Sequence, residues 1–123
     1  AKAKSNDIVS LAIDGNIFAL GSSGEITKFY RGEKADFVQA KVDPSLSSAL
    51  KIMTSDTMQN LYVLDPANKR VVIFSKNGAL IRQIFLDDMS SLADIAISPD
   101  EQRIYALDGT KVTEIPLVES TGN

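Results

Sequence analysis

One short pattern occurs three times in this chain at nearly equal spacing: an apolar residue, an aromatic residue, a small or branched residue, and leucine. The copies are Ile17-Phe18-Ala19-Leu20, Leu61-Tyr62-Val63-Leu64 and Ile104-Tyr105-Ala106-Leu107, so they begin 44 and 43 residues apart. The segments that follow each copy also match, at residues 25–29, 70–74 and 111–115. The chain is therefore built from repeated units, and the repeat decides which folds are possible.

A period of about 40–45 residues with four short strands per unit is typical of the blades of a β-propeller. The pattern predicts an all-β chain of three consecutive four-stranded antiparallel blades, the last of which lacks its outer strand. We place blade one at about 7–43, blade two at about 47–87 and blade three at about 89–118, with a tail over 119–123. Because propellers close with about 4–8 blades, we expect these three to be part of a larger six-bladed or similar propeller.

The strands themselves support this prediction. Residues 61–64 and 71–74 are apolar without interruption, whereas a sheet with one wet face would alternate. Such strands need cover on both faces. Asn77-Gly78 predicts a type I′ hairpin turn, because both residues of this pair readily adopt positive φ. We expect the fourth strand of blade one at 37–42, and a strand rather than a helix within 47–58.

The segment Asp-Pro-Ala-Asn-Lys-Arg-Val-Val-Ile-Phe at residues 65–74, followed by Lys76-Asn77-Gly78, resembles an NHL-type β-propeller repeat. Asn68-Lys69-Arg70 stands where that family usually carries its Asn-His-Leu tripeptide. The resemblance covers about 40 residues of blade two, while blades one and three match only in strand pattern. It implies a propeller with a binding role, as in most relatives, although some relatives are hydrolases or lyases with a metal in the channel. Such a resemblance predicts fold better than function.

Composition excludes several kinds of chemistry. The chain has no cysteine and no histidine, which removes disulfides, thiolate chemistry, Ser-His-Asp and Cys-His catalysis and the usual zinc sites. Its 13 basic residues are scattered singly and its net charge is −3, so we expect no nucleic-acid partner. No apolar run approaches the roughly 18–20 residues that cross a bilayer, so we expect no membrane contact within this segment. No catalytic residue, metal site or cofactor is predicted.

The first strand of each blade borders the central channel, where propellers bind ligands. In the repeat alignment Ser10, Lys51 and Asp94 occupy equivalent positions near the starts of these strands. They are the candidate ligand-binding residues, as part of a polar site at the channel mouth in which Lys51 and Asp94 pair or hold an anion. The alternative is that they are solvated or form an ion pair between blades, worth about 0–1 kcal/mol.

Two further sets of residues have a structural and a functional interpretation. Asp65 and Arg70 flank a turn in blade two, which is either an exposed recognition loop or a structural turn. In the structural turn, the Asp65 carboxylate accepts backbone N–H groups and Arg70 pairs with it. Phe18, Tyr62 and Tyr105 hold equivalent positions in the second strands, and we expect them to stack between blades as core rather than form a ligand cage.

Three blades leave two outer sheet faces rich in Ile, Val and Leu, and large exposed faces of that kind bind other surfaces. We expect missing propeller blades or a second copy of the chain to cover them. Missing blades would make the chain the C-terminal half of a larger propeller. A second copy would complete a six-bladed ring, and the absent outer strand of blade three argues against that arrangement.

The predicted function is a non-catalytic binding or scaffold module that presents loops and a channel mouth to a protein or a small-molecule ligand. One alternative is a fragment of a propeller enzyme with a divalent metal bound in the channel. Another is a sensor domain attached to an upstream signalling module.

Overall fold

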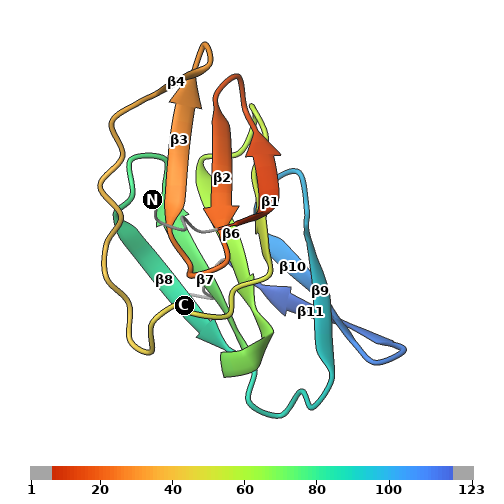
Figure 1. Cartoon of the computed structure of the whole chain (residues 1–123). Coiled ribbons are helices and arrows are strands. Elements are labelled where there is room, and N and C mark those ends of the chain that lie inside the picture. Colours follow the sequence, from red (N-terminus) through yellow and green to blue (C-terminus); the bar gives the residue numbers. More distant parts are fainter. Residues whose placement is uncertain (1–6, 118–123) are drawn as a thin grey trace.

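The computed structural model describes residues 7–117 and shows three antiparallel sheets that follow one another along the chain (Figure 1). The first sheet contains β1 (Ile8–Ile13), β2 (Ile17–Gly21), β3 (Ile26–Tyr30) and β4 (Glu33–Lys34). The second contains β5 (Lys51–Met53), β6 (Asn60–Asp65), β7 (Arg70–Ser75) and β8 (Leu80–Phe85), with a 3-10 turn η1 (Pro66–Asn68) after β6. The third contains β9 (Leu92–Ile97), β10 (Arg103–Asp108) and β11 (Lys111–Pro116). Within each sheet the strands pair in chain order. Over residues 7–117 the chain is all-β and forms three propeller blades of 4, 4 and 3 strands.

The three blades share one register, as the repeat predicts. In each blade the first strand pairs with the second so that Ser10 faces Leu20, Lys51 faces Leu64, and Asp94 faces Leu107. Side chains alternate between the two faces of a strand. Equivalent residues therefore point toward the same neighbouring blade in all three units.

The cores lie between blades, not within them. One buried cluster joins blades one and two and is built around Phe18, Leu20, Ile52, Leu61 and Phe74. A second cluster joins blades two and three and includes the residues Tyr62, Leu64, Val71, Ile95 and Ile104. Blade two is thus covered on both faces, which explains its uninterrupted apolar strands.

The fourth strand of blade one differs from the expectation. Residues 37–42 are irregular, and the outer strand is the two-residue β4, which pairs Phe29 with Lys34 and Tyr30 with Glu33. The physical reason lies in Gln39. Its side-chain amide accepts a hydrogen bond from the Ile26 backbone N–H (2.8 Å) and donates one to the Gly24 carbonyl (2.9 Å). A side chain therefore supplies the two hydrogen bonds at this sheet edge that a strand would otherwise make.

The turn at Asn77-Gly78 also differs from the type I′ prediction, because only Gly78 of the pair has positive φ (102°). Four residues connect β7 to β8, closed by hydrogen bonds from the Gly78 N–H to the Ser75 carbonyl (3.1 Å) and from the Ser75 N–H to the Ala79 carbonyl (2.8 Å). The segment before Ala40 packs onto this turn, and a Cβ at Gly78 would lie 2.0 Å from the Val38 carbonyl oxygen. Glycine is needed here both for its φ and for the close approach of a second backbone.

The remaining expectations on helices are met. Residues 47–58 contain β5 and no α-helix. Within residues 7–117 there is no helix of the length and apolarity that a membrane span requires.

Candidate functional site

The three candidate residues lie on the first strands of their blades and touch the neighbouring blade. The Ser10 hydroxyl oxygen accepts a hydrogen bond from the backbone N–H of Ile52 at 3.0 Å. The Lys51 ammonium donates to Asp94 Oδ1 at 2.8 Å, and the Ile95 backbone N–H donates to the same oxygen at 2.9 Å. The structure therefore joins Lys51 directly to Asp94, and it joins Ser10 to the residue that follows Lys51.

The electrostatics of this set favour a contact between blades. The hydrogen bond from Lys51 lowers the pKa of the Asp94 carboxyl, against a smaller opposing effect of burial. Both side chains are about half-exposed, so water screens the pair and its net value is about 0–1 kcal/mol. The Lys51 charge is already compensated by Asp94, which weakens its attraction for an anion. The pair matches the ion pair between blades that the sequence left open as the alternative.

Asp65 and Arg70 form a buried network at the η1 turn, not an exposed recognition loop. Both side chains are 0% exposed, and Arg70 Nε donates to Asp65 Oδ2 at 2.8 Å. Arg70 also donates to Gln83 Oε1 (2.6 Å) and to the carbonyl oxygens of Pro44 and Ser45. The predicted pairing is confirmed. The predicted backbone contacts of Asp65 are wrong, because among the described residues its carboxylate accepts from the Arg70 and Asn68 side chains.

Glu101 is a residue that the sequence did not single out. It sits in the turn between β9 and β10 with φ of 59°, and its carboxylate reaches back to blade two. There it accepts hydrogen bonds from the backbone N–H groups of Gln59 (2.8 Å) and Asn60 (3.3 Å) and from the Tyr62 hydroxyl (2.9 Å). Burial and the Glu101 hydrogen bond raise the pKa of Tyr62. No local pattern could have revealed this contact, since the two partners are about 40 residues apart and belong to different repeats.

The Glu101 contact borders a groove on the protein surface. This groove of about 360 Å³ runs between blades two and three, and its lining includes Asn60, Arg82, Asp100, Glu101 and Gln102. Its principal acceptor and donor are already used: Glu101 holds Tyr62, and Arg82 donates to the Leu117 carbonyl at 2.8 Å. The hydrogen bonds along this groove therefore hold the two blades together.

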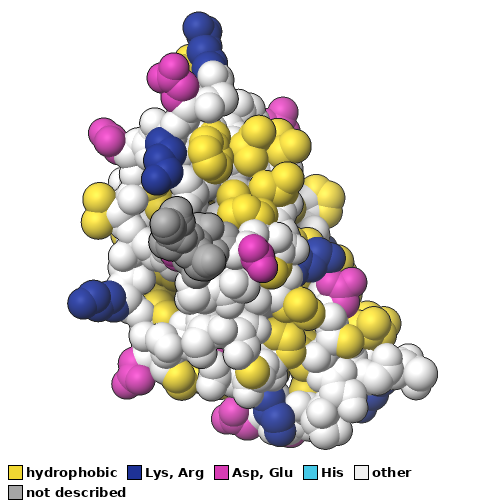
Figure 2. Space-filling model, viewed as in Figure 1, with side chains coloured by type: hydrophobic (Ala, Val, Ile, Leu, Met, Phe, Trp, Pro, Cys, Tyr) yellow, Lys and Arg dark blue, Asp and Glu magenta, His cyan; other side chains and the backbone are white. Residues whose placement is uncertain are grey.

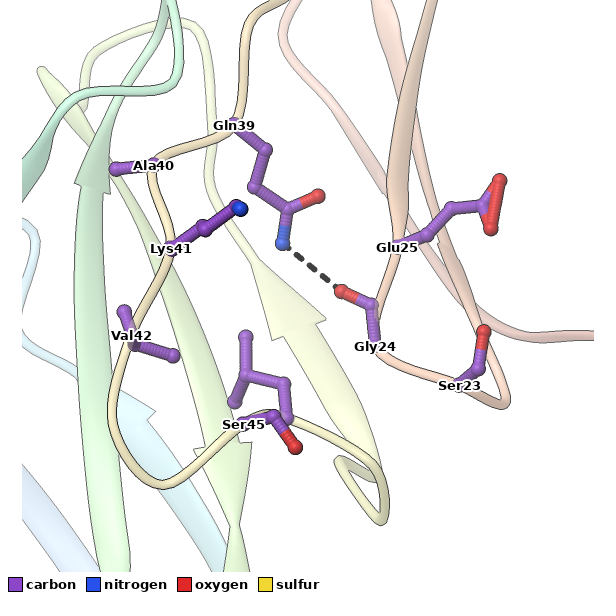
Figure 3. Close-up of a pocket in the computed structure, with 9 residues that line it drawn as sticks. Ser23, Gly24, Glu25, Gln39, Ala40, Lys41, Val42 and Ser45 are labelled. Atoms are coloured by element: carbon purple, nitrogen blue, oxygen red, sulfur yellow. Dashed lines mark hydrogen bonds between the residues drawn. The ribbon is translucent and has the colours of Figure 1, made fainter.

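A second hollow, of about 330 Å³, lies between the irregular segment 39–42 and the turn that joins β2 to β3 (Figure 3). Figure 3 shows the Gln39 amide spanning this hollow to the Gly24 carbonyl, and the Glu25 side chain directed away from it. Lys41 and Ser45 line the opposite wall. The polar side chains of its lining include the hydroxyls of Ser23 and Ser45 and the ammonium group of Lys41.

The described residues contain no group of three Asp or Glu side chains placed to hold a metal ion. Asp14, in the turn between β1 and β2, pairs with Lys76 of blade two. Partial burial alone would raise the pKa of Asp14. The hydrogen bonds that its carboxylate accepts from the Lys76 side chain and the Asn16 backbone N–H outweigh burial, so the net pKa lies below the usual value.

Comparison of the chain with protein-family models and with curated proteins found no match. Comparison with solved structures found propellers. One is titled "Crystal structure of Nidogen/Laminin Complex" and superposes with a TM-score of 0.63 at 16% identity, over 89% of this chain and 48% of that one. Another, "KlHsv2 with loop 6CD replaced by a Gly-Ser linker", gives a TM-score of 0.63 at 12% identity, over 94% of this chain and 37% of that one.

The chain thus spans less than half the length of either structure. Likeness at this level of identity carries information about fold alone. It supports a propeller-like all-β fold, and the NHL assignment of the repeat is not confirmed by a family match. By its fold, this chain is a set of β-propeller blades.

Proposed function

We propose that this chain is a non-catalytic scaffold that binds protein through the two sheet faces at the ends of its blade stack. One observation carries the proposal. The outer face of blade one exposes Leu11 (59%) and Ile13 (61%), and the outer face of blade three exposes Val112 (65%). Figure 2 shows the hydrophobic side chains gathered over β1 and β2. Apolar sheet faces of this kind mark interaction surfaces in soluble proteins.

The interior of the stack suits a scaffold. The polar groups between blades pair with one another, as in the Lys51–Asp94 ion pair and the Glu101 contacts to blade two. Paired groups hold the blades in fixed relative positions, and rigid surfaces lose little conformational entropy when they bind. The titles of the structural neighbours describe one protein–protein complex, and we extend that mode of action to this chain as part of the proposal.

Binding of an apolar dye tests whether these faces are accessible. At protein concentrations low enough to keep the chain monomeric, we expect 8-anilinonaphthalene sulfonate (ANS) to fluoresce with the native protein and to lose most of that signal with Leu11→Glu combined with Val112→Glu. Val38→Glu is the matched control, because Val38 is exposed but lies in the irregular segment of blade one rather than on a blade face. Equal dye binding by both variants would show that the end faces are not the binding surfaces.

A divalent-ion titration tests the non-catalytic part of the proposal. An enzyme with a channel metal would gain stability by binding Ca²⁺ or another divalent ion, because a ligand that binds only the folded state raises the melting temperature. We expect indifference to Ca²⁺, Mg²⁺ and Mn²⁺ in thermal unfolding. A rise of several degrees would favour the enzyme alternative instead.

The channel-side residues remain a smaller part of the proposal. Ser10, Lys51 and Asp94 line up along the first strands, and we propose that a ligand at the channel mouth would contact them. Lys51 and Asp94 already pair with each other and Ser10 already accepts from the Ile52 N–H, so we give this contact secondary importance.

A further inference from the structure

We propose that the partner of the two end faces is a second copy of this chain, bound head to tail so that blade three of each copy packs on blade one of the other. This inference rests on the proposed function and names the partner. We call the face that a blade turns toward the preceding blade its leading face, and the face toward the following blade its trailing face. The leading face of blade one and the trailing face of blade three are the two end faces.

The leading face of blade one repeats surfaces that are buried elsewhere in the same molecule. Leu11 is equivalent in register to Ile52 and Ile95, which face Val63 and Ala106 as Leu11 faces Ala19. Ile52 is 2% exposed and Ile95 is 4% exposed because each packs against the preceding blade, whereas Leu11 is 59% exposed. The same kind of residue stands at all three positions, and only the one in blade one has no blade before it among residues 7–117.

The trailing face of blade three likewise exposes a residue whose equivalents are buried in the other blades. Val112 is equivalent in register to Ile26 and Val71, which face Leu20 and Leu64 as Val112 faces Leu107. Ile26 is 6% exposed and Val71 is 0% exposed, whereas Val112 is 65% exposed. A shallow, largely apolar hollow of about 210 Å³ lies on this face, lined by Asp94, Ile95, Ala96, Tyr105, Leu107 and Val112.

Each copy therefore exposes one leading face and one trailing face, the two surfaces that pack together twice within the copy itself. Leading and trailing faces meet between blades one and two and again between blades two and three, and a second copy offers each end face the surface that its equivalents contact. Phe18 and Tyr62 are buried in these two contacts at 0% and 1% exposure. Their equivalent, Tyr105, stays partly exposed on the end face, as it would in a copy without its partner.

The polar residues at one register position of the first strands also contact the following blade. Ser10 reaches the backbone N–H of Ile52 in the next blade, and Lys51 reaches Asp94 in the next blade. Asp94 is the third residue of this series, and its Oδ2 atom makes no hydrogen bond within the described part of the chain. In the head-to-tail arrangement this oxygen faces the backbone N–H of Leu11 in the other copy, the equivalent of Ile52.

The arrangement closes on itself. Heterologous contacts form rings when their rotation closes, and two copies of three blades make six, within the range of about 4–8 that closed propellers use. Within residues 7–117 blade three has no fourth strand, and this does not interrupt the contact. A fourth strand would lie beyond β11, at the edge of the blade away from the channel, where blade one has a strand of two residues. The faces that meet are formed by the first three strands.

Sedimentation velocity over a range of concentrations tests the proposal on the full chain. We expect a discrete species of twice 13.3 kDa. Leu11→Glu and Val112→Glu should each raise the dissociation constant about 100-fold or more, because each places an unpaired charge in both apolar contacts of the ring. Val38→Glu should leave the dimer unchanged. Far-UV circular dichroism and melting curves verify that the variants fold. We expect them to fold because the three substituted side chains are exposed in the single chain.

The outcomes separate this proposal from the more general one. A dimer that survives either end-face variant would overturn head-to-tail binding, because a contact between two identical faces needs only one of the end faces. An open ladder of oligomers would overturn the closed ring. A monomer that binds ANS through its end faces would overturn the second copy as partner and leave the scaffold function intact, with other blades as the occupant. A monomer that binds no dye would overturn both.

Discussion

Replacing Arg70 by methionine is the change that tests the buried ion pair most directly. Arg70 and Asp65 are both 0% exposed, and without the guanidinium the Asp65 carboxylate keeps only the Asn68 amide as a hydrogen-bond donor. Its second oxygen, Oδ1, is buried and has no hydrogen-bond partner among residues 7–117. Removing one member of a buried pair costs about 3–5 kcal/mol, because the remaining charge is left uncompensated. A domain of this size unfolds with about 5–15 kcal/mol, so Arg70→Met should remove a large share of the stability.

Lys51→Met provides the matched control. The Lys51–Asp94 pair has the same 2.8 Å length as the Arg70–Asp65 pair, but its two side chains are half-exposed. Surface pairs of that kind contribute about 0–1 kcal/mol. The two substitutions remove ion pairs of equal length, but Arg70→Met also removes the hydrogen bonds from Arg70 to Gln83 and to the Pro44 and Ser45 carbonyls. The difference between their effects therefore measures what burial and this hydrogen-bond network add together.

Urea unfolding followed by far-UV circular dichroism measures both effects, since the chain has no tryptophan. The double variant Asp65→Asn with Arg70→Met should be more stable than Arg70→Met alone by about 1 kcal/mol or more, because the second change removes the stranded charge. A loss of less than about 1 kcal/mol for Arg70→Met, or a further loss on adding Asp65→Asn, would refute the reasoning.

Two further predictions concern contacts that join distant segments. Gly78→Ala should cost more than Gly32→Ala in urea unfolding by about 1 kcal/mol or more, because overpacking is added to the backbone strain that both substitutions share. Both glycines have positive φ, but only at Gly78 does the new Cβ meet another backbone, at Val38; equal losses would show that the segment moves aside freely. The pKa of Tyr62 is raised above its ordinary 10.0, so the unfolded chain loses this proton first as pH rises. Stability should fall above pH 10 by up to about 1.4 kcal/mol per pH unit from this residue. In urea unfolding between about pH 9 and 11.5, Tyr62→Phe should flatten that slope, and at neutral pH it should cost about 1–3 kcal/mol because Glu101 loses a donor; parallel pH slopes would contradict the Glu101 contact.

The sequence was sufficient to predict the blades because the packing between them repeats. Each blade must present apolar residues at the same register positions, so the copies at 17–20, 61–64 and 104–107 could be aligned without a structure. The same alignment placed Lys51 and Asp94 on the first strands of neighbouring blades and left the ion pair between blades as one of two interpretations. Repetition converts a local pattern into information about long-range contacts.

The features that escaped prediction do not repeat. Gln39 replaces a strand at the edge of blade one through a side-chain amide, and Glu101 reaches blade two through a turn in blade three. Neither residue has an equivalent contact in the other blades. The turn at Asn77-Gly78 departed from its usual geometry because Val38 packs on it, and no pattern within the hairpin records that distant neighbour.

Because the cores lie between blades, the first and last blades each leave one apolar face exposed. In the part of the chain that the structure describes, no blade has a core of its own, because the buried apolar residues form two clusters that each lie between neighbouring blades. Stability in such a stack is a sum of contacts between neighbours, so the terminal units hold only one contact each and need a cap or another unit. Blade one ends in an exposed Leu11 and blade three in an exposed Val112, where a capping unit would carry a polar outer face. An apolar face at each end is therefore the feature of this stack on which the proposed association with another surface depends.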